Sequence, residues 1–138
     1  MQKTLIAAGL IILVLFGVSF YFYPVLPAQM ASHWDINGEV NGYLAKDFAL
    51  FLVPVLAAFL CLVFFLIPRL DPLKQNIEEF VNYYYGFIVL LLLFMLLVQM
   101  HIILWNIGTK IDVLLTFPLG LGVLFFYIGI LLEKTKPN

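Results

Sequence analysis

The sequence has little charge, and its four long hydrophobic runs contain no Asp, Glu, Lys or Arg at all. Charged residues make up 11% of the 138 residues and hydrophobic residues 64%, with a mean hydropathy of +1.10. These values lie outside the range of soluble globular domains. A charge at the bilayer centre costs roughly 2.5 to 3.5 kcal/mol on insertion scales, so the uncharged runs indicate an integral membrane protein.

The chain also lacks the residue sets that most enzymes, disulfide-bonded proteins and nucleic-acid-binding proteins need. A single cysteine, Cys61, excludes an intrachain disulfide, and a net charge of -1 leaves no basic face for nucleic acid. We find no serine, histidine and acid set, no phosphate-binding glycine loop and no paired-carboxylate site. We therefore expect a non-enzymatic protein without a cofactor or a bound metal.

The hydrophobic runs have the length of membrane-spanning helices. A bilayer core of about 30 Å requires about 20 apolar residues in a helix, and residues 4–23, 48–67, 83–104 and 113–132 meet this length. The sequence thus predicts an all-α membrane protein, with residues 1–138 as a single membrane domain of four transmembrane helices. In the first helix we expect the face bearing Ala8, Gly9 and Gly17 to be the packing side, because small residues let helix backbones approach.

Positive charges are distributed unequally between the two sides that four spans create. One side carries Lys3, Arg69, Lys74, Lys134 and Lys136, and the other carries Lys46 and Lys110. Because cytoplasmic loops carry an excess of Lys and Arg, both termini are predicted to be cytoplasmic. We therefore expect a multi-pass protein of the cell membrane, surrounded by the lipid bilayer, with residues 24–47 as an extracytoplasmic loop subdomain.

This outer loop has the pattern of a small β-hairpin. Asn37-Gly38 is a strong signal for a two-residue type I′ turn, in which both central residues have positive φ. Residues 30–36 and 39–43 would form the two short arms. The fold class is therefore four transmembrane helices with a small hairpin-like domain between the first two.

The predicted turn also sets which side chains share a face. With a two-residue turn, Trp34 would face Asn41 across the hairpin. Side chains alternate along a strand, so His33 and Asp35 would share one face, and Glu39 would lie on the other face with Trp34.

A metal site is one alternative for these polar residues. His33 and Asp35 could be joined by His101, which lies near the outer end of the third hydrophobic run. The predicted facing of Glu39 and the lack of a cysteine or third histidine argue against zinc. The spacing around Asn37 does not match an EF-hand calcium loop either. We expect a structural histidine with an acidic partner rather than a metal ligand.

The loop and its flanks carry a family pattern: Leu-Pro, then His-aromatic-x-x-x-Gly-Glu-x-x-Gly-Tyr, then a basic residue before the next helix. The matching residues are Leu26, Pro27, His33, Trp34, Gly38, Glu39, Gly42, Tyr43 and Lys46, followed by Pro54, Leu70-Asp71-Pro72 and Asn76-Ile77. With this pattern, roughly the first eighty residues resemble the domain of unknown function at the amino end of the bacterial Sdp immunity protein family.

The resemblance implies membership of a group whose best-understood member resists a secreted peptide toxin and recruits a transcriptional repressor to the membrane. We expect the outer loop to bind or sense a surface ligand, such as a peptide or a membrane-protein partner. The candidate binding residues are His33, Trp34, Asp35, Asn37, Gly38, Glu39, Gly42, Tyr43, Lys46 and His101.

Other interpretations of the same residues remain open. Gly38 and Gly42 also suit turn positions, and Trp34 and Tyr43 suit anchors at the membrane interface. The uniformly apolar helices are equally compatible with a small accessory or scaffolding subunit of a larger complex, or with an oligomer. A small transporter is a third alternative, in which His101 would be the ionisable group in the membrane.

Overall fold

The computed structural model describes residues 2–70 and 80–134 of the chain. The elements are helix α1 (Gln2–Phe22), the 3-10 turn η1 (Tyr23–Val25), strands β1 (Gln29–Trp34) and β2 (Val40–Ala45), and helices α2 (Lys46–Leu70), α4 (Val81–Asn106) and α5 (Val113–Lys134). Of the residues used in the sequence predictions, Asp71, Pro72, Lys74, Asn76, Ile77 and Lys136 lie outside the described residues.

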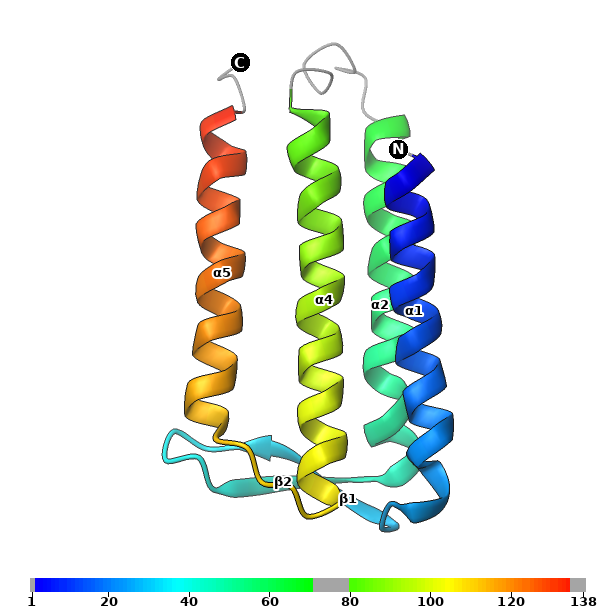
Figure 1. Cartoon of the computed structure of the whole chain (residues 1–138), viewed down its shortest axis with the longest axis vertical. Coiled ribbons are helices and arrows are strands. Elements are labelled where there is room, and N and C mark those ends of the chain that lie inside the picture. Colours follow the sequence, from blue (N-terminus) through cyan, green and yellow to red (C-terminus); the bar gives the residue numbers. More distant parts are fainter. Residues whose placement is uncertain (1, 71–79, 135–138) are drawn as a thin grey trace.

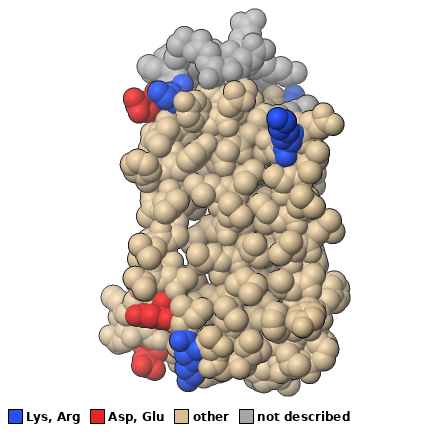
Figure 2. Space-filling view, viewed as in Figure 1, with Lys and Arg blue, Asp and Glu red and all other residues tan. Residues whose placement is uncertain are grey.

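The four helices run side by side, and the two strands cross one end of the bundle (Figure 1). The beginning of α1 and the end of α5 both lie at the opposite end, on different sides of the bundle. All four helices are long and apolar enough to cross a membrane. Lys, Arg, Asp and Glu side chains gather toward the two ends, and an uncharged belt lies between them (Figure 2). The predicted fold class of four membrane-type helices with a small hairpin is confirmed.

Helix α4 is the central element, because it packs against α1, α2 and α5. Helix α4 and its partners form two buried clusters. The first lies within the bundle and contains Ala8, Leu15, Ala57, Ile88 and Leu92. The other lies beside the hairpin and contains Leu26, Met30, Leu50 and Ile103. The hairpin is therefore part of the hydrophobic core and not a free loop.

The packing face of α1 agrees with our expectation at Ala8 and differs from it at Gly9 and Gly17. The buried residues of this helix are Ala8, Leu15 and Ser19, whereas a side chain added at Gly9 or Gly17 would meet open space. At 3.6 residues per turn, Ala8, Leu15 and Ser19 fall on one face, and the two glycines fall on others. Alanine, leucine and serine, not glycine, therefore form the contact surface.

The hairpin turn has a different geometry from the predicted type I′ turn. The Asp35 amide donates to the Glu39 carbonyl (2.8 Å) and the Gly38 amide donates to the Asp35 carbonyl (3.0 Å), which closes a three-residue loop. Gly38 has a φ of 81°, while Asn37 does not have positive φ. This is a type I turn followed by a left-handed glycine. One Asp35 carboxylate oxygen accepts from the Asn37 amide (2.8 Å) and the Glu39 amide (3.0 Å), which stabilises this alternative.

The longer loop shifts the pairing of the strands next to it. Trp34 faces Val40 and not the predicted Asn41, and His33 faces Gly42 with an irregularity on either side of it. Trp34 packs on His101 of α4, while His33 is exposed. The extra loop residue thus places the indole against the helix bundle.

Candidate functional site

Asn106, the last residue of α4, attaches the hairpin to the bundle. Its side-chain oxygen accepts from the Ala31 amide (2.8 Å), and its side-chain nitrogen donates to the Ala31 carbonyl (2.9 Å). The same nitrogen donates to the Ile102 carbonyl (2.8 Å), which holds the amide in this orientation. The Asn106 side-chain amide thus pairs with the backbone amide and carbonyl of Ala31 in the way that a neighbouring strand would. Sequence analysis missed this role, because one Asn at the end of a hydrophobic run has no distinguishing pattern.

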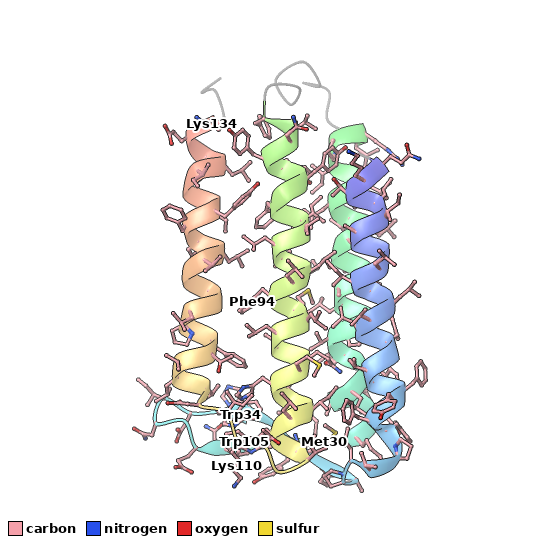
Figure 3. All side chains as sticks on the ribbon, in the orientation of Figure 1. Met30, Trp34, Phe94, Trp105, Lys110 and Lys134 are labelled. Carbon is pink, nitrogen blue, oxygen red and sulfur yellow. The ribbon has the colours of Figure 1, made fainter. Side chains whose placement is uncertain are left out.

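An aromatic cluster joins β1, α4 and α5 beside this attachment. The Trp34 ring lies edge-on to His101 (4.9 Å between centroids), Trp105 (5.4 Å) and Phe117 (6.4 Å). His101 also contacts Phe117 at 4.9 Å. Figure 3 shows Trp34 and Trp105 close together at the hairpin end of the bundle. Trp34 is therefore a packing residue between hairpin and helices.

Several polar atoms in and near this cluster are buried without a hydrogen-bond partner. His101 is 2% exposed, and neither of its ring nitrogens has a partner among the described residues. The indole nitrogen of Trp34 and the side-chain oxygen of Gln99 are also buried without a hydrogen-bond partner among the described residues. Each such group costs about 1–3 kcal/mol when it stays unpaired. Unpaired groups are rare in native structures and call for an explanation.

A partly open pocket of about 290 Å3 lies beside the cluster. We call it the hairpin pocket, and its lining residues are Ser32, His33, Trp34 and Asp35 of the hairpin and Val113, Leu114, Phe117 and Pro118 of α5. The structure thus brings His33, Trp34 and Asp35 together at one pocket, with His101 in contact with its Trp34 and Phe117 walls.

Prolines inside the helices create further polar groups, because proline has no amide hydrogen for the carbonyl four residues before it. Pro54 leaves the Leu50 carbonyl without its helical donor. That carbonyl instead accepts from the Ser19 hydroxyl and from the Gln99 side-chain nitrogen, both at 2.9 Å. The Gln99 nitrogen also donates to the Ser19 oxygen (2.8 Å). A buried polar contact thus links α1, α2 and α4.

The other two prolines differ from each other. Pro68 leaves the Phe64 carbonyl of α2 without a helical donor, and the Tyr84 hydroxyl donates to it (2.8 Å). Pro118 likewise leaves the Leu114 carbonyl of α5 without its helical donor. Within residues 2–70 and 80–134, no side-chain hydrogen bond to that carbonyl is found, and both Leu114 and Pro118 line the hairpin pocket.

Lys46 has a structural role at the other side of the hairpin. Its ammonium group donates to the carbonyls of Tyr23 and Leu26, both at 3.1 Å, and lies 4.4 Å from the centre of the Tyr23 ring. The Tyr23 hydroxyl in turn donates to the Asp47 carboxylate (2.6 Å). Lys46 therefore ties the end of α1 to the start of α2 and does not reach the pocket lining.

The remaining predicted residues shape the hairpin or face outward. A side chain at Gly42 would place its Cβ 2.8 Å from the His33 Cβ, so the close approach of the strands requires glycine. The His33 ring pairs with the Asn41 side chain. Asn37, Glu39 and Tyr43 are exposed and are not part of the pocket lining.

The geometry does not support the metal alternative. No group of three His, Cys, Asp or Glu side chains that could hold a metal ion is found in the described part of the chain. His33 pairs with an amide and Asp35 with turn amides, whereas His101 is surrounded by aromatic rings.

Fold and site together define a multi-pass membrane-type protein with a packed hairpin at one end of its helices. Residues 10–58 match the family model of a domain of unknown function, DUF1648. This segment covers most of α1, the hairpin and the first half of α2. No curated protein and no solved structure matches the chain. The pocket thus combines hairpin residues inside the matched segment with α5 residues outside it.

Proposed function

We infer that this is a non-enzymatic integral membrane protein that binds a surface ligand or partner at its hairpin end. The observation that carries this proposal is the hairpin pocket, where open volume lies beside buried polar groups without partners. An apolar pocket with a few polar groups is the usual form of a ligand site. Unpaired buried groups are costly to stability, so their presence beside such a pocket favours a binding role.

An extracytoplasmic hairpin is part of the proposal. The excess of Lys and Arg on the side of the termini supports it through the positive-inside rule. The hairpin lies at the end of the bundle opposite to the termini (Figure 1). The pocket would then open at the outer surface of the cell membrane.

The resemblance to the amino-terminal domain of the Sdp immunity family supports a more specific role. A protein of that kind would act in toxin immunity or in signalling at the membrane. The DUF1648 match over residues 10–58 is compatible with this role but has no assigned activity.

Crosslinking in living cells tests the proposal. A photoreactive amino acid is placed at His33, on the pocket wall, and at Tyr43, which is 63% exposed on β2. The control position is Leu62 of α2, which is 59% exposed on the apolar belt. We expect a defined adduct from the hairpin positions and only lipid from Leu62. The absence of any adduct from both hairpin positions would contradict the proposal.

An accessory subunit of a larger complex is the second candidate. Helix α5 packs mainly against α4, and between them lies a groove of about 210 Å3. The groove is lined by Leu90, Leu93, Phe94, Leu97, Gly120 and Val123. Light scattering of the protein in a mild detergent tests this candidate, and a lone monomer counts against it. A transporter would instead require flux in liposomes that is lost in the His101→Phe variant.

A further inference from the structure

The aromatic cluster around His101 is the place where the turn of the hairpin meets the helices. We call residues 33–40 the turn half of the hairpin. Its Trp34 ring packs on His101 of α4 and Phe117 of α5, and its Gly38 lies beside α5 (Figure 1). Within the described part of the chain, no hydrogen bond joins the turn half to α4 or α5. The turn half is therefore held to the bundle by apolar and aromatic contacts.

The other half of the hairpin is held more firmly. Met30 is fully buried in the core, and the backbone of Ala31 makes two hydrogen bonds to the Asn106 side chain. Between the halves the strand pairing is irregular, on both sides of His33. Irregular pairing bends a strand and interrupts its ladder of hydrogen bonds. The hairpin thus has a bending point between a firmly held half and a half held only by packing.

His101 is the ionisable member of the cluster that holds the turn half. Its ring lies 4.9 Å from Trp34 and from Phe117 and stacks on Trp105, and neither ring nitrogen has a partner among the described residues. A neutral imidazole suits these surroundings. A protonated one would be a buried charge without an anion beside it, which is costly. The attraction of aromatic faces for a cation replaces only part of the lost hydration.

The charged groups of the neighbouring elements do not offset such a charge. On the hairpin, Asp35 uses a carboxylate oxygen for two turn amides, and His33 pairs its ring with a side-chain amide. Before α5, Asp112 accepts from the first turn of that helix, and the Lys110 ammonium lies 5.4 Å from the centre of the Trp105 ring, where it would repel a second cation. Helix α4 itself contains no Asp, Glu, Lys or Arg.

We propose that His101 makes the attachment of the turn half acid-sensitive. A neutral His101 holds Trp34 against α4 and α5, and a proton on the imidazole releases Trp34, while Asn106 keeps its bonds to Ala31. The hairpin pocket lies between the turn half and α5, so acid also separates its walls. This device does not depend on the proposed ligand binding.

The direction follows from where the proton is accepted. In the released state the imidazole is exposed and takes up a proton near the ordinary histidine value of about pH 6.5. In the docked state the proton is excluded by burial. The released state therefore binds more protons in acid, and the docked state is favoured above about pH 6.5 and weakens about tenfold for each pH unit below it.

Hydrogen exchange of the indole N–H groups tests the proposal. The chain has two tryptophans, so the full-length nitrogen-15-labelled protein in detergent micelles gives two indole NMR signals, and Trp105→Phe assigns the signal of Trp34. Exchange rates are divided by those of free indole at the same pH, which removes the intrinsic effect of pH. Below about pH 6.5 the protection of Trp34 should fall about tenfold per pH unit. The protection of the Ala31 amide should stay constant.

The two histidines of the chain provide the variant and its matched control. His101→Phe keeps a planar ring and removes the titrating group, so the protection of Trp34 should become independent of pH. His33→Gln removes the exposed histidine and should leave the fall unchanged. If His101→Phe does not fold, the His33→Gln variant decides, because His101 is then the only side chain that ordinarily titrates between about pH 5 and about pH 8.

Three results would overturn the proposal. The first is constant protection of Trp34 down to about pH 5 in the wild-type protein, across the ordinary histidine range. The second is a fall that persists in His101→Phe or that His33→Gln abolishes. The third is an equal fall at the Ala31 amide, because the firmly held half would then open together with the turn half.

Discussion

At the scale of single residues, much of the polar sequence pattern serves to fold the hairpin. Asp35 holds the turn amides, Gly42 allows the close approach of His33, and Lys46 joins the end of α1 to α2. The resemblance to a known domain therefore rests largely on residues that maintain shape. Buried polar groups without a partner among the described residues, such as the Trp34 N–H, lie beside them.

The Asn106 contact gives the first prediction. Asn106→Leu leaves the Ala31 amide and carbonyl without their side-chain partner. We expect it to lower the free energy of unfolding by about 1–3 kcal/mol. Unfolding by SDS titration measures this loss, with amide hydrogen exchange at Ala31 as the local probe. Asn37→Ala is the control, because Asn37 is exposed at the hairpin turn, and unchanged exchange at Ala31 in Asn106→Leu would refute the argument.

Gly42 gives a second prediction at this scale. Gly42→Ala introduces a Cβ that would lie 2.8 Å from the His33 Cβ. The strands must move apart, and we expect a loss of stability of about 1–3 kcal/mol. Gly17→Ala is the control, because its added methyl group meets open space. The double variant His33→Gly/Gly42→Ala removes the opposing Cβ, so thermal unfolding should show partial recovery; a Gly42→Ala variant as stable as the control would contradict this view.

At the scale of secondary structure elements, the helices compensate for their own prolines. The Leu50 and Phe64 carbonyls of α2 each receive a donor from a neighbouring helix. A carbonyl that lacks a partner in the bilayer is costly, so these contacts fix which helices can lie next to α2. Proline in this bundle is thus a contact point as well as a break in the helical pattern.

A rescue experiment tests this role of Pro54. Ser19→Ala/Gln99→Leu removes both donors to the Leu50 carbonyl. We expect a destabilisation of about 1–3 kcal/mol, because the carbonyl is then unpaired. Adding Pro54→Ala supplies a helical amide and should recover part of the loss in SDS titration. If the triple variant is less stable than the double variant, the carbonyl is not the cause.

The sequence predicts the elements better than their contacts. Hydropathy alone locates the helices, since the spans 4–23, 48–67, 83–104 and 113–132 lie within a few residues of the observed ends. The predicted type I′ turn is wrong. Asn37-Gly38 also suits a type I turn followed by a left-handed glycine, and the Asp35 carboxylate favours this second geometry. Pairings such as Asn106 with Ala31 depend on tertiary placement, which no local pattern encodes.

At the scale of the whole molecule, the testable feature is its orientation in the membrane. In a Cys61→Ala background, Asn37→Cys should react with a membrane-impermeant maleimide in intact cells. Lys134→Cys should react only after permeabilisation. The expectation follows from the charge distribution and from the positions of the hairpin and the end of α5 at opposite ends of the bundle (Figure 1). Protection of position 37 together with labelling of position 134 in intact cells would reverse the proposed orientation.

The bond between Ala31 and Asn106 spans 75 positions of the chain. During synthesis, therefore, the ribosome must finish α4 before β1 can acquire this partner. A truncated product ending at α2 would contain the whole DUF1648 segment and still lack Asn106, His101 and Phe117. The segment that the family model matches thus depends on a later-made helix to complete its structure.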